Sequence, residues 1–169
     1  MSNMKKKNYF SELLCRLVGC SRPTVDNSVV TDFDLNRFLG DWYEIARFDH
    51  RFERGMEKTK ANYVLRRDGK VGVTNSGMKK DRHYEANGVA KLTDTPALLR
   101  VSFWRPFYSD YRIMYIDEDY QHALIGSGSD SYLWIMSRRS QISDEIKSRI
   151  SAEAERRGYD TSRLIWMNQ

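Results

Sequence analysis

Apolar and polar side chains alternate along most of the chain, in short segments that turn residues separate. The alternation predicts strands over residues 42–48, 60–67, 71–76, 84–92, 98–104, 111–117, 120–126 and 132–138. Asp68-Gly69, between the second and third strands, is a strong hairpin signal, because both residues tolerate the positive φ of a type I′ turn. Eight antiparallel strands can close into a barrel whose interior holds one small ligand.

The alternation also predicts which faces point into the barrel. In the fifth strand Leu99, Val101 and Phe103 share one face, opposite Arg100 and Ser102. Such a pattern is typical of a strand with one buried side. The inward face of the fourth strand carries small residues, which is equally consistent with a cavity and with ordinary packing against bulky neighbours.

The predicted strand at 132–138 differs from the others because residues 132–136 are apolar on both faces, so its outer face should be covered. A helix follows, with Ser143 as its N-cap and Gly158 at its end. Its apolar positions, expected to lie against the barrel wall, are Ile146, Ile150 and Ala154. Residues 164–166 then form a terminal strand or a packing segment.

Composition supports one domain with a substantial core. The chain has 169 residues, 12% of them aromatic, and a net charge of +5. Length alone permits a core without metals or disulfides. The basic residues are scattered rather than gathered in a stripe, which indicates a solvated surface and argues against nucleic-acid binding.

Candidate chemistry inside the barrel is sparse. The three histidines, His50, His83 and His122, are far apart and lack the spacing of metal ligands, so no metal and no cofactor is expected. Glu44 and Glu85 have no matched acid, base or nucleophile, which argues against an enzyme. Glu44 shares the phase of Trp42, and we expect it to be a buried polar residue bonded to a tyrosine.

The first twenty residues allow two interpretations. Three lysines precede a partly apolar stretch, and Leu17-Val18-Gly19-Cys20 fits the pattern around a lipid-modified cysteine. Glu12 and Arg16 interrupt the stretch, so a degenerate lipoprotein signal competes with a cytosolic amphipathic extension. Neither Cys15 nor Cys20 lies within the predicted domain. We expect a signal or extension at 1–20, a tether at 21–32 and one domain at 33–169.

Three sequence blocks, at residues 37–55, 101–108 and 132–138, resemble the lipocalins, and in particular the outer-membrane lipocalins of bacteria. The first block contains Gly40-x-Trp42. The resemblance implies an all-β, eight-stranded up-and-down barrel with one C-terminal helix on its outside. It also implies a closed end built by Gly40, Trp42, Asp117 and Arg138, with the arginine packed over the indole ring. Asp117 lies in a block that departs from the common Thr-Asp-Tyr form.

The resemblance further implies a binding protein for transport or storage of a fatty acid or lysophospholipid, in cell-envelope maintenance or stress response. The expected lining is Ala61, Tyr63, Leu65, Val73, Tyr84, Ala86, Leu99, Val101, Phe103, Tyr111, Ile113 and Tyr115. The expected open-end rim is His50, Arg51, Phe52 and Arg54, whose arginines, with Lys58, meet an anionic headgroup or are simply solvated. A carrier of a flat pigment such as a tetrapyrrole and a barrel enzyme remain alternatives.

The resemblance also extends to the cysteine. In bacterial lipocalins a cysteine followed by a Pro-containing tether carries the lipid anchor, and the matching residue here is Cys20. This implies an outer-membrane lipoprotein that faces the periplasm, held to the membrane by its anchor, and a monomer or weak homodimer. A cytoplasmic location is the alternative.

Overall fold

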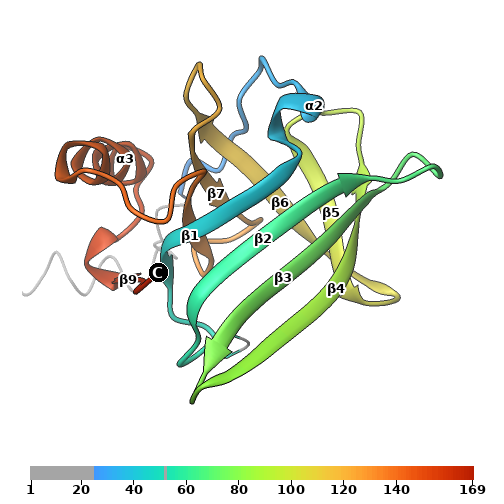
Figure 1. Cartoon of the computed structure of the whole chain (residues 1–169). Coiled ribbons are helices and arrows are strands. Elements are labelled where there is room, and N and C mark those ends of the chain that lie inside the picture. The colour runs from blue at the N-terminus through green and yellow to red at the C-terminus, as the bar shows by residue number, and fades with distance from the viewer. Residues whose placement is uncertain (1–24, 52) are drawn as a thin grey trace, which may run out of the picture.

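The computed structural model describes residues 25–51 and 53–169, which form a closed antiparallel barrel (Figure 1). Its strands are β1 (Gly40–Phe48), β2 (Glu57–Leu65), β3 (Val71–Lys79), β4 (Arg82–Leu92), β5 (Leu98–Trp104), β6 (Phe107–Ile116), β7 (His122–Gly126) and β8 (Leu133–Ser137). Each strand pairs with the next in sequence, and β1 pairs with both β8 and β2 to close the circle. The predicted eight-stranded barrel is confirmed.

The two ends of the barrel differ. At one end, uppermost in Figure 1, the short helix α2 (Leu35–Phe38) lies beside the β6–β7 turn. The opposite end carries the β1–β2, β3–β4 and β5–β6 connections. Asp34 caps α2 by accepting a hydrogen bond from the Asn36 amide at 2.8 Å, and Phe38 is buried. The α2 end is called the closed end below, and the opposite end the mouth.

The pairing of the described strands is irregular at four places, and the β-bulges on β1 and β6 change which buried residues face inward. On β1, Glu44 pairs with Met136 but Ala46 pairs with Ile135, so one residue is extra. On β6, Ile113 pairs with Ile125 but Tyr115 pairs with Leu124. An extra residue reverses the alternation beyond it.

The core has two parts, one inside the barrel and one outside it. Inside, Phe38, Trp42, Leu99 and Ile113 belong to one buried cluster. Outside, α3 (Asp144–Arg156) places Ile150 and Ala154 on β7 and β8. This outer cluster buries the second apolar face of β8, as the sequence predicts.

The helix α3 forms where its capping residues predict. The Ser143 hydroxyl accepts a hydrogen bond from the Ile146 amide at 3.3 Å, and Gly158, at φ +88°, follows the helix end. Ile146 is partly buried against the outer cluster. The chain then passes through η1 (Thr161–Arg163) into β9 (Leu164–Trp166), which pairs with the second half of β1.

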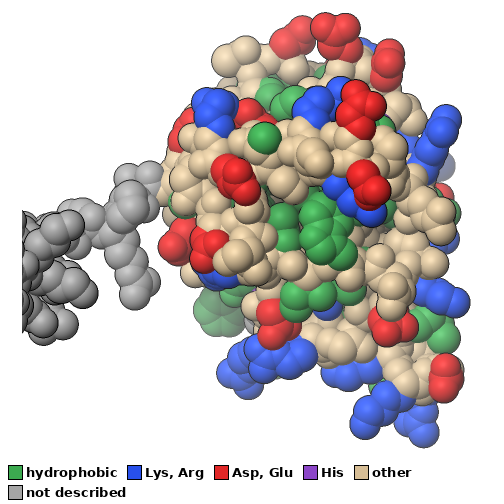
Figure 2. Space-filling view, turned by 90° about the vertical axis from the view of Figure 1, so that its left-hand side faces the viewer, with side chains coloured by type: hydrophobic (Ala, Val, Ile, Leu, Met, Phe, Trp, Pro, Cys, Tyr) green, Lys and Arg blue, Asp and Glu red, His purple; other side chains and the backbone are tan. Residues whose placement is uncertain are grey.

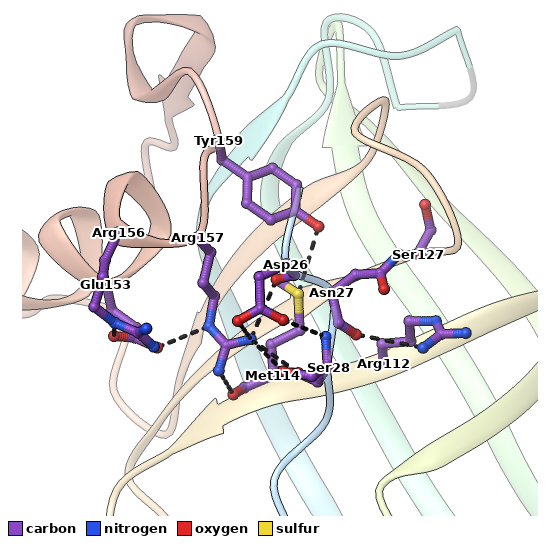
Figure 3. Close-up of polar contacts among 10 residues, drawn as sticks. All are labelled: Asp26, Asn27, Ser28, Arg112, Met114, Ser127, Glu153, Arg156, Arg157 and Tyr159. Atoms are coloured by element: carbon purple, nitrogen blue, oxygen red, sulfur yellow. Dashed lines mark hydrogen bonds and ion pairs between the residues drawn. The ribbon is translucent and has the colours of Figure 1, made fainter. Parts of the chain in front are cut away.

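The segment 25–32 lies on the barrel rather than forming part of a free tether. Buried Arg157 donates hydrogen bonds to the carbonyls of Ser28 at 2.9 Å and Met114 at 2.6 Å (Figure 3). The Asn27 side-chain amide donates to the Ser127 carbonyl at 3.2 Å. The predicted tether therefore includes residues that belong to the domain.

Candidate functional site

Arg138 and Trp42 close one end of the barrel. The guanidinium carbon of Arg138 lies 4.0 Å from the centre of the Trp42 ring, and the indole is fully buried. Arg138 also donates to the backbone carbonyls of Arg37, Asp41 and Leu39 at 2.7, 2.7 and 2.9 Å. The predicted stacking is thus present, and one arginine ties α2 to the start of β1.

Gly40 and Asp117 shape the same end. Gly40 has φ +93°, where a side chain would be strained, and a Cβ there would lie 3.5 Å from an Arg138 nitrogen. Asp117 accepts hydrogen bonds from the amides of Gln121 and His122 at 2.7 and 3.0 Å and contacts the His122 ring at 2.6 Å. Although partial burial raises the pKa of Asp117, these hydrogen bonds outweigh it and lower that pKa.

The half of the barrel next to Trp42 is packed. Five of the predicted lining residues belong to the inner cluster and are at most 5% exposed: Ala61, Tyr63, Val73, Leu99 and Ile113. The Tyr63 and Tyr111 hydroxyls lie 2.6 Å apart in this packed region, and burial raises the pKa of both tyrosines. These residues form a floor across the barrel.

The mouth half is open along one side. The pairing of β4 with β5 ends at Val89 and Ser102, so β4 runs on toward the mouth without a β5 partner. Two predicted lining residues there, Tyr84 and Phe103, are 47% and 45% exposed. Val101 is half-buried and Ala86 is exposed. Inward-facing apolar side chains are therefore accessible to solvent on the mouth side of the floor.

A buried cluster of charged side chains lies on the β1 side of the mouth. Arg47 Nη1 is 2.5 Å from Glu44 Oε1, and both residues are at most 5% exposed. Arg47 also donates to the Glu53 carbonyl at 2.6 Å. His50 Nε2 lies 2.9 Å from Glu53 Oε2, and the Trp134 indole donates to the same oxygen at 3.4 Å. The β1–β2 loop is thus tied to the barrel wall.

Arg47 lies between the buried carboxylate of Glu44 and the partly buried carboxylate of Glu53, whose pKa values differ. Burial raises the pKa of Glu44 to about 8, and the negative charge of Glu53 adds to the effect, while Arg47 opposes it. Burial also raises the pKa of Glu53, but the hydrogen bond and charge of His50, together with Arg47, outweigh burial and lower that pKa. The cluster therefore favours an ionised Glu53 and a protonated Glu44.

The C-terminal tail completes this cluster. Beyond β9, the Gln169 side chain donates to the carbonyls of Glu44 and Thr59, which lie on β1 and β2 where these strands diverge. Met167 Sδ lies 2.6 Å from Arg47 Nη1. The tail therefore fills the space between the two strands and covers the arginine.

The structure corrects several sequence predictions. Tyr115 does not line the interior: it packs against the outer cluster under α3, because the bulge on β6 reverses its direction. Leu65 is 46% exposed at the closed-end tip of β2, beyond the floor. Glu85 is exposed and accepts a hydrogen bond from Asn87 at 3.1 Å. Glu44 is buried as predicted, but Arg47 bonds it rather than a tyrosine.

Only some of the residues predicted to form the open-end rim border solvent. His50 is buried in the charged cluster, so it does not border solvent. Arg54 pairs with Asp49 at 2.8 Å, Arg51 is exposed, and Phe52 lies outside the described residues. Sequence reasoning missed Arg47 and Glu53, because simple alternation places Arg47 on the outer face and the bulge returns it to the interior.

The raised pKa of Glu44 predicts how Glu44→Gln changes stability with pH. Between the ordinary value of 4.5 and about 8 only the folded protein holds this proton, so folding stability falls as pH rises, by at most ~1.4 kcal/mol per pH unit. Glutamine cannot ionise. We expect urea unfolding to show that the free energy of unfolding of Glu44→Gln rises relative to that of the parent from pH 5 to pH 9.

Glu85→Gln is the matched control, because this glutamate is exposed, and its difference from the parent should stay constant. A Glu44→Gln variant that is equally destabilised at every pH would contradict a protonated Glu44.

The described residues offer little other chemistry. Among residues 25–51 and 53–169, no three His, Cys, Asp or Glu side chains are arranged to hold a metal ion. Within the same part of the chain, no helix combines the length and apolar character needed to cross a bilayer. The site consists of an apolar mouth, a packed floor and a buried charged cluster at one side.

Comparison with known proteins gives one consistent result. The model of a lipocalin-like domain matches residues 33–169. The chain is 48% identical over 159 residues to outer membrane lipoprotein Blc of Escherichia coli K12, with 90% of each chain covered. It is 39% identical over 148 residues to temperature-induced lipocalin-1 of Arabidopsis thaliana, with 80% of this chain and 79% of the relative covered.

Solved structures agree on the fold. Insecticyanin from the tobacco hornworm Manduca sexta superposes with a TM-score of 0.70 at 19% identity, covering 88% of this chain and 86% of that one. Lobster apocrustacyanin A1 gives a TM-score of 0.66 at 18% identity, covering 79% and 78%. At such low identity the likeness concerns the barrel alone.

Proposed function

Because the chain belongs to the lipocalin family and is thus a binding protein for a small hydrophobic ligand, we propose that its ligand is a fatty acid or a lysophospholipid. The acyl chain would lie in the mouth half of the barrel, above the floor that contains Leu99 and Ile113. The observation that carries the proposal is the accessible apolar surface on the inward face of β4 and β5.

The energetics favour an acyl chain. Moving each methylene from water into an apolar site contributes ~0.8 kcal/mol, so a chain of moderate length can bind tightly without specific polar contacts. Tyr84, Val101 and Phe103 offer mainly carbon atoms. A polar headgroup would remain near the mouth, where Arg51 and Lys58 are exposed and Arg54 carries a further positive charge.

A role in the cell envelope is part of the proposal. The relative from Escherichia coli is named an outer membrane lipoprotein, and so is the relative from Vibrio cholerae, which is 37% identical over 164 residues. The candidate for acylation is Cys20, which lies outside the described residues. Its lipid would hold the domain at the outer membrane, on the periplasmic side.

Val101→Trp tests where the ligand binds. An indole at this half-buried inward position would occupy the space above the floor, so we expect affinity for a fluorescent fatty acid to fall at least about tenfold. Arg100→Trp, the next residue on the opposite face of the same strand, is the matched control and should bind normally. Equal affinities in both variants, measured by titration, would place the ligand elsewhere.

The bound ligand can be identified directly. We expect mass spectrometry of lipid extracted from the natively purified protein to find fatty acid or lysophospholipid in stoichiometric amount. A visible absorption band that co-purifies with the protein would instead favour a pigment carrier. Hydrolysis of ester substrates that Glu44→Gln abolishes would favour an enzyme.

A further inference from the structure

The tip of the β5–β6 hairpin exposes two large aromatic side chains. Trp104 is 83% exposed and Phe107 is 76% exposed, the highest values among the exposed large hydrophobic residues of the described chain. They pair directly across the hairpin, with only Arg105 and Pro106 between them. Because side chains of paired residues lie on the same face, the two rings form one apolar projection.

This projection borders the mouth. Phe103, directly before Trp104, lies on the inward face and is 45% exposed, and its ring lies against Gly88 of β4. On the other side of the opening, β4 continues without a β5 partner and exposes Tyr84. Exposed apolar side chains therefore lie both at the hairpin tip and at the adjoining opening between β4 and β5.

Positive charge accompanies these aromatic residues. Arg105 lies between the two aromatic residues in sequence, and elsewhere at the mouth end the β3–β4 turn carries Lys79, Lys80 and Arg82 against one acid, Asp81. Figure 2 shows Lys and Arg side chains gathered along the lower edge of the molecule, the mouth end, and acidic side chains along the upper edge. On the face that Figure 2 shows, basic side chains thus outnumber acidic ones at the mouth end.

A small pocket at the base of the hairpin contains an unpaired buried hydroxyl. The pocket, of about 240 Å³, is lined by Arg66, Arg105, Phe103 and Ser102 among others. Ser102 is 3% exposed, and its Oγ has no hydrogen-bond partner among the described residues. A hydroxyl in a pocket that two arginines help to line can donate to a phosphate oxygen, which would satisfy it.

We propose that the β5–β6 hairpin docks the barrel mouth on a phospholipid bilayer with anionic headgroups. Trp104 and Phe107 enter the interfacial layer, where aromatic rings with basic neighbours are favoured. Arg105 and the β3–β4 turn contact headgroup phosphates, one of which occupies the Ser102 pocket. The mouth then faces the lipid phase from which a ligand comes or to which it is delivered.

The charge pattern favours a bilayer over a second copy of this chain. A symmetric contact through the hairpin tip would place Arg105 near its own counterpart, and like charges across an interface are unfavourable. An anionic lipid surface complements them and attracts each basic residue near it.

Vesicle co-sedimentation of the full chain tests the proposal. Cys20→Ser serves as the background, so that an acyl anchor does not mask binding. We expect binding to phosphatidylcholine vesicles that contain phosphatidylglycerol, and weaker binding without it or at high salt. Trp104→Ser with Phe107→Ser should weaken partitioning at least about tenfold. Val64→Ser, on a 56% exposed side chain near the closed end, is the control and should change nothing.

Two further measurements decide the mechanism. Trp104 fluorescence should shift to the blue on vesicle binding, and Trp104→Phe should bind but lose most of that shift. Arg105→Glu should reduce the preference for phosphatidylglycerol. Unchanged partitioning of the double variant, or a loss of dimers in sedimentation velocity without a loss of vesicle binding, would overturn the proposal.

Experiments can reject the docking proposal and the proposed ligand independently of each other. Affinity for a soluble fluorescent fatty acid should be the same in the double hairpin variant and the parent, because both rings are more than three-quarters exposed at the hairpin tip. Normal fatty-acid binding with unchanged vesicle binding rejects docking alone. Vesicle binding without fatty-acid binding rejects the proposed ligand alone.

Discussion

Trp42→Ala is expected to destabilise the protein by about 3–5 kcal/mol while leaving the ligand affinity of the folded fraction close to that of the parent. The indole is fully buried, packs 5.1 Å from the Phe38 ring and carries Arg138 over its face. Its removal leaves a cavity at the closed end and deprives Arg138 of its stacking partner. The floor of Leu99 and Ile113 separates this cavity from the mouth.

Melting temperature and fatty-acid titration of the same preparation check this expectation. Trp166→Ala is the control, because Trp166 is 43% exposed on β9 and its loss should cost far less stability. A Trp42→Ala variant that keeps its stability but loses affinity would mean that the closed end takes part in binding. A proportional loss of both would mean that the floor does not insulate the two halves.

The closed end was accessible to sequence reasoning because its signals are local. Gly40-x-Trp42 marks the start of β1, and the lipocalin resemblance supplies Arg138 as its partner. The helix α3 is also local, since Ser143 caps it and its apolar positions repeat every four residues. Strand β5 follows the alternation as far as Val101, and Leu99 and Val101 face inward as predicted, before a register shift against β6.

The mouth was less predictable, because its arrangement depends on irregular pairing. The bulge on β1 turns Arg47 inward, and the bulge on β6 turns Tyr115 outward. Alternation assumes that every residue has a partner, so it cannot place an extra one. The early end of β4–β5 pairing, which exposes Tyr84, likewise leaves no mark in the sequence.

Contacts distant in sequence explain the remaining difference. The sequence predicts residues 25–32 as part of a flexible tether, yet Val25, Val29 and Val30 pack on the barrel. Arg157, 129 residues beyond Ser28, bonds to the Ser28 carbonyl. The tail after β9 bonds to β1 and β2 through Gln169. In both cases side-chain donors satisfy backbone carbonyls that no strand pairs, and such contacts follow from the folded topology alone.

Arg47→Met is expected to destabilise the protein by about 3–5 kcal/mol and to release the β1–β2 loop. Arg47 is 1% exposed, contacts Glu44 and holds the Glu53 carbonyl, so methionine would fill much of the volume but leave Glu53 buried with less compensation. We expect the lost stability in urea unfolding to be accompanied by faster proteolysis within residues 49–56.

Arg54→Met is the matched control for this change. Arg54 lies in the same loop, but its side chain is 64% exposed and its ion pair with Asp49 is open to solvent, so its loss should cost less than about 1 kcal/mol. Because burial raises the pKa of Glu44 to about 8, we expect that Glu44→Gln does not rescue Arg47→Met, whereas Glu53→Gln in the same background recovers part of the stability. Rescue by Glu44→Gln alone would instead assign the buried negative charge to Glu44.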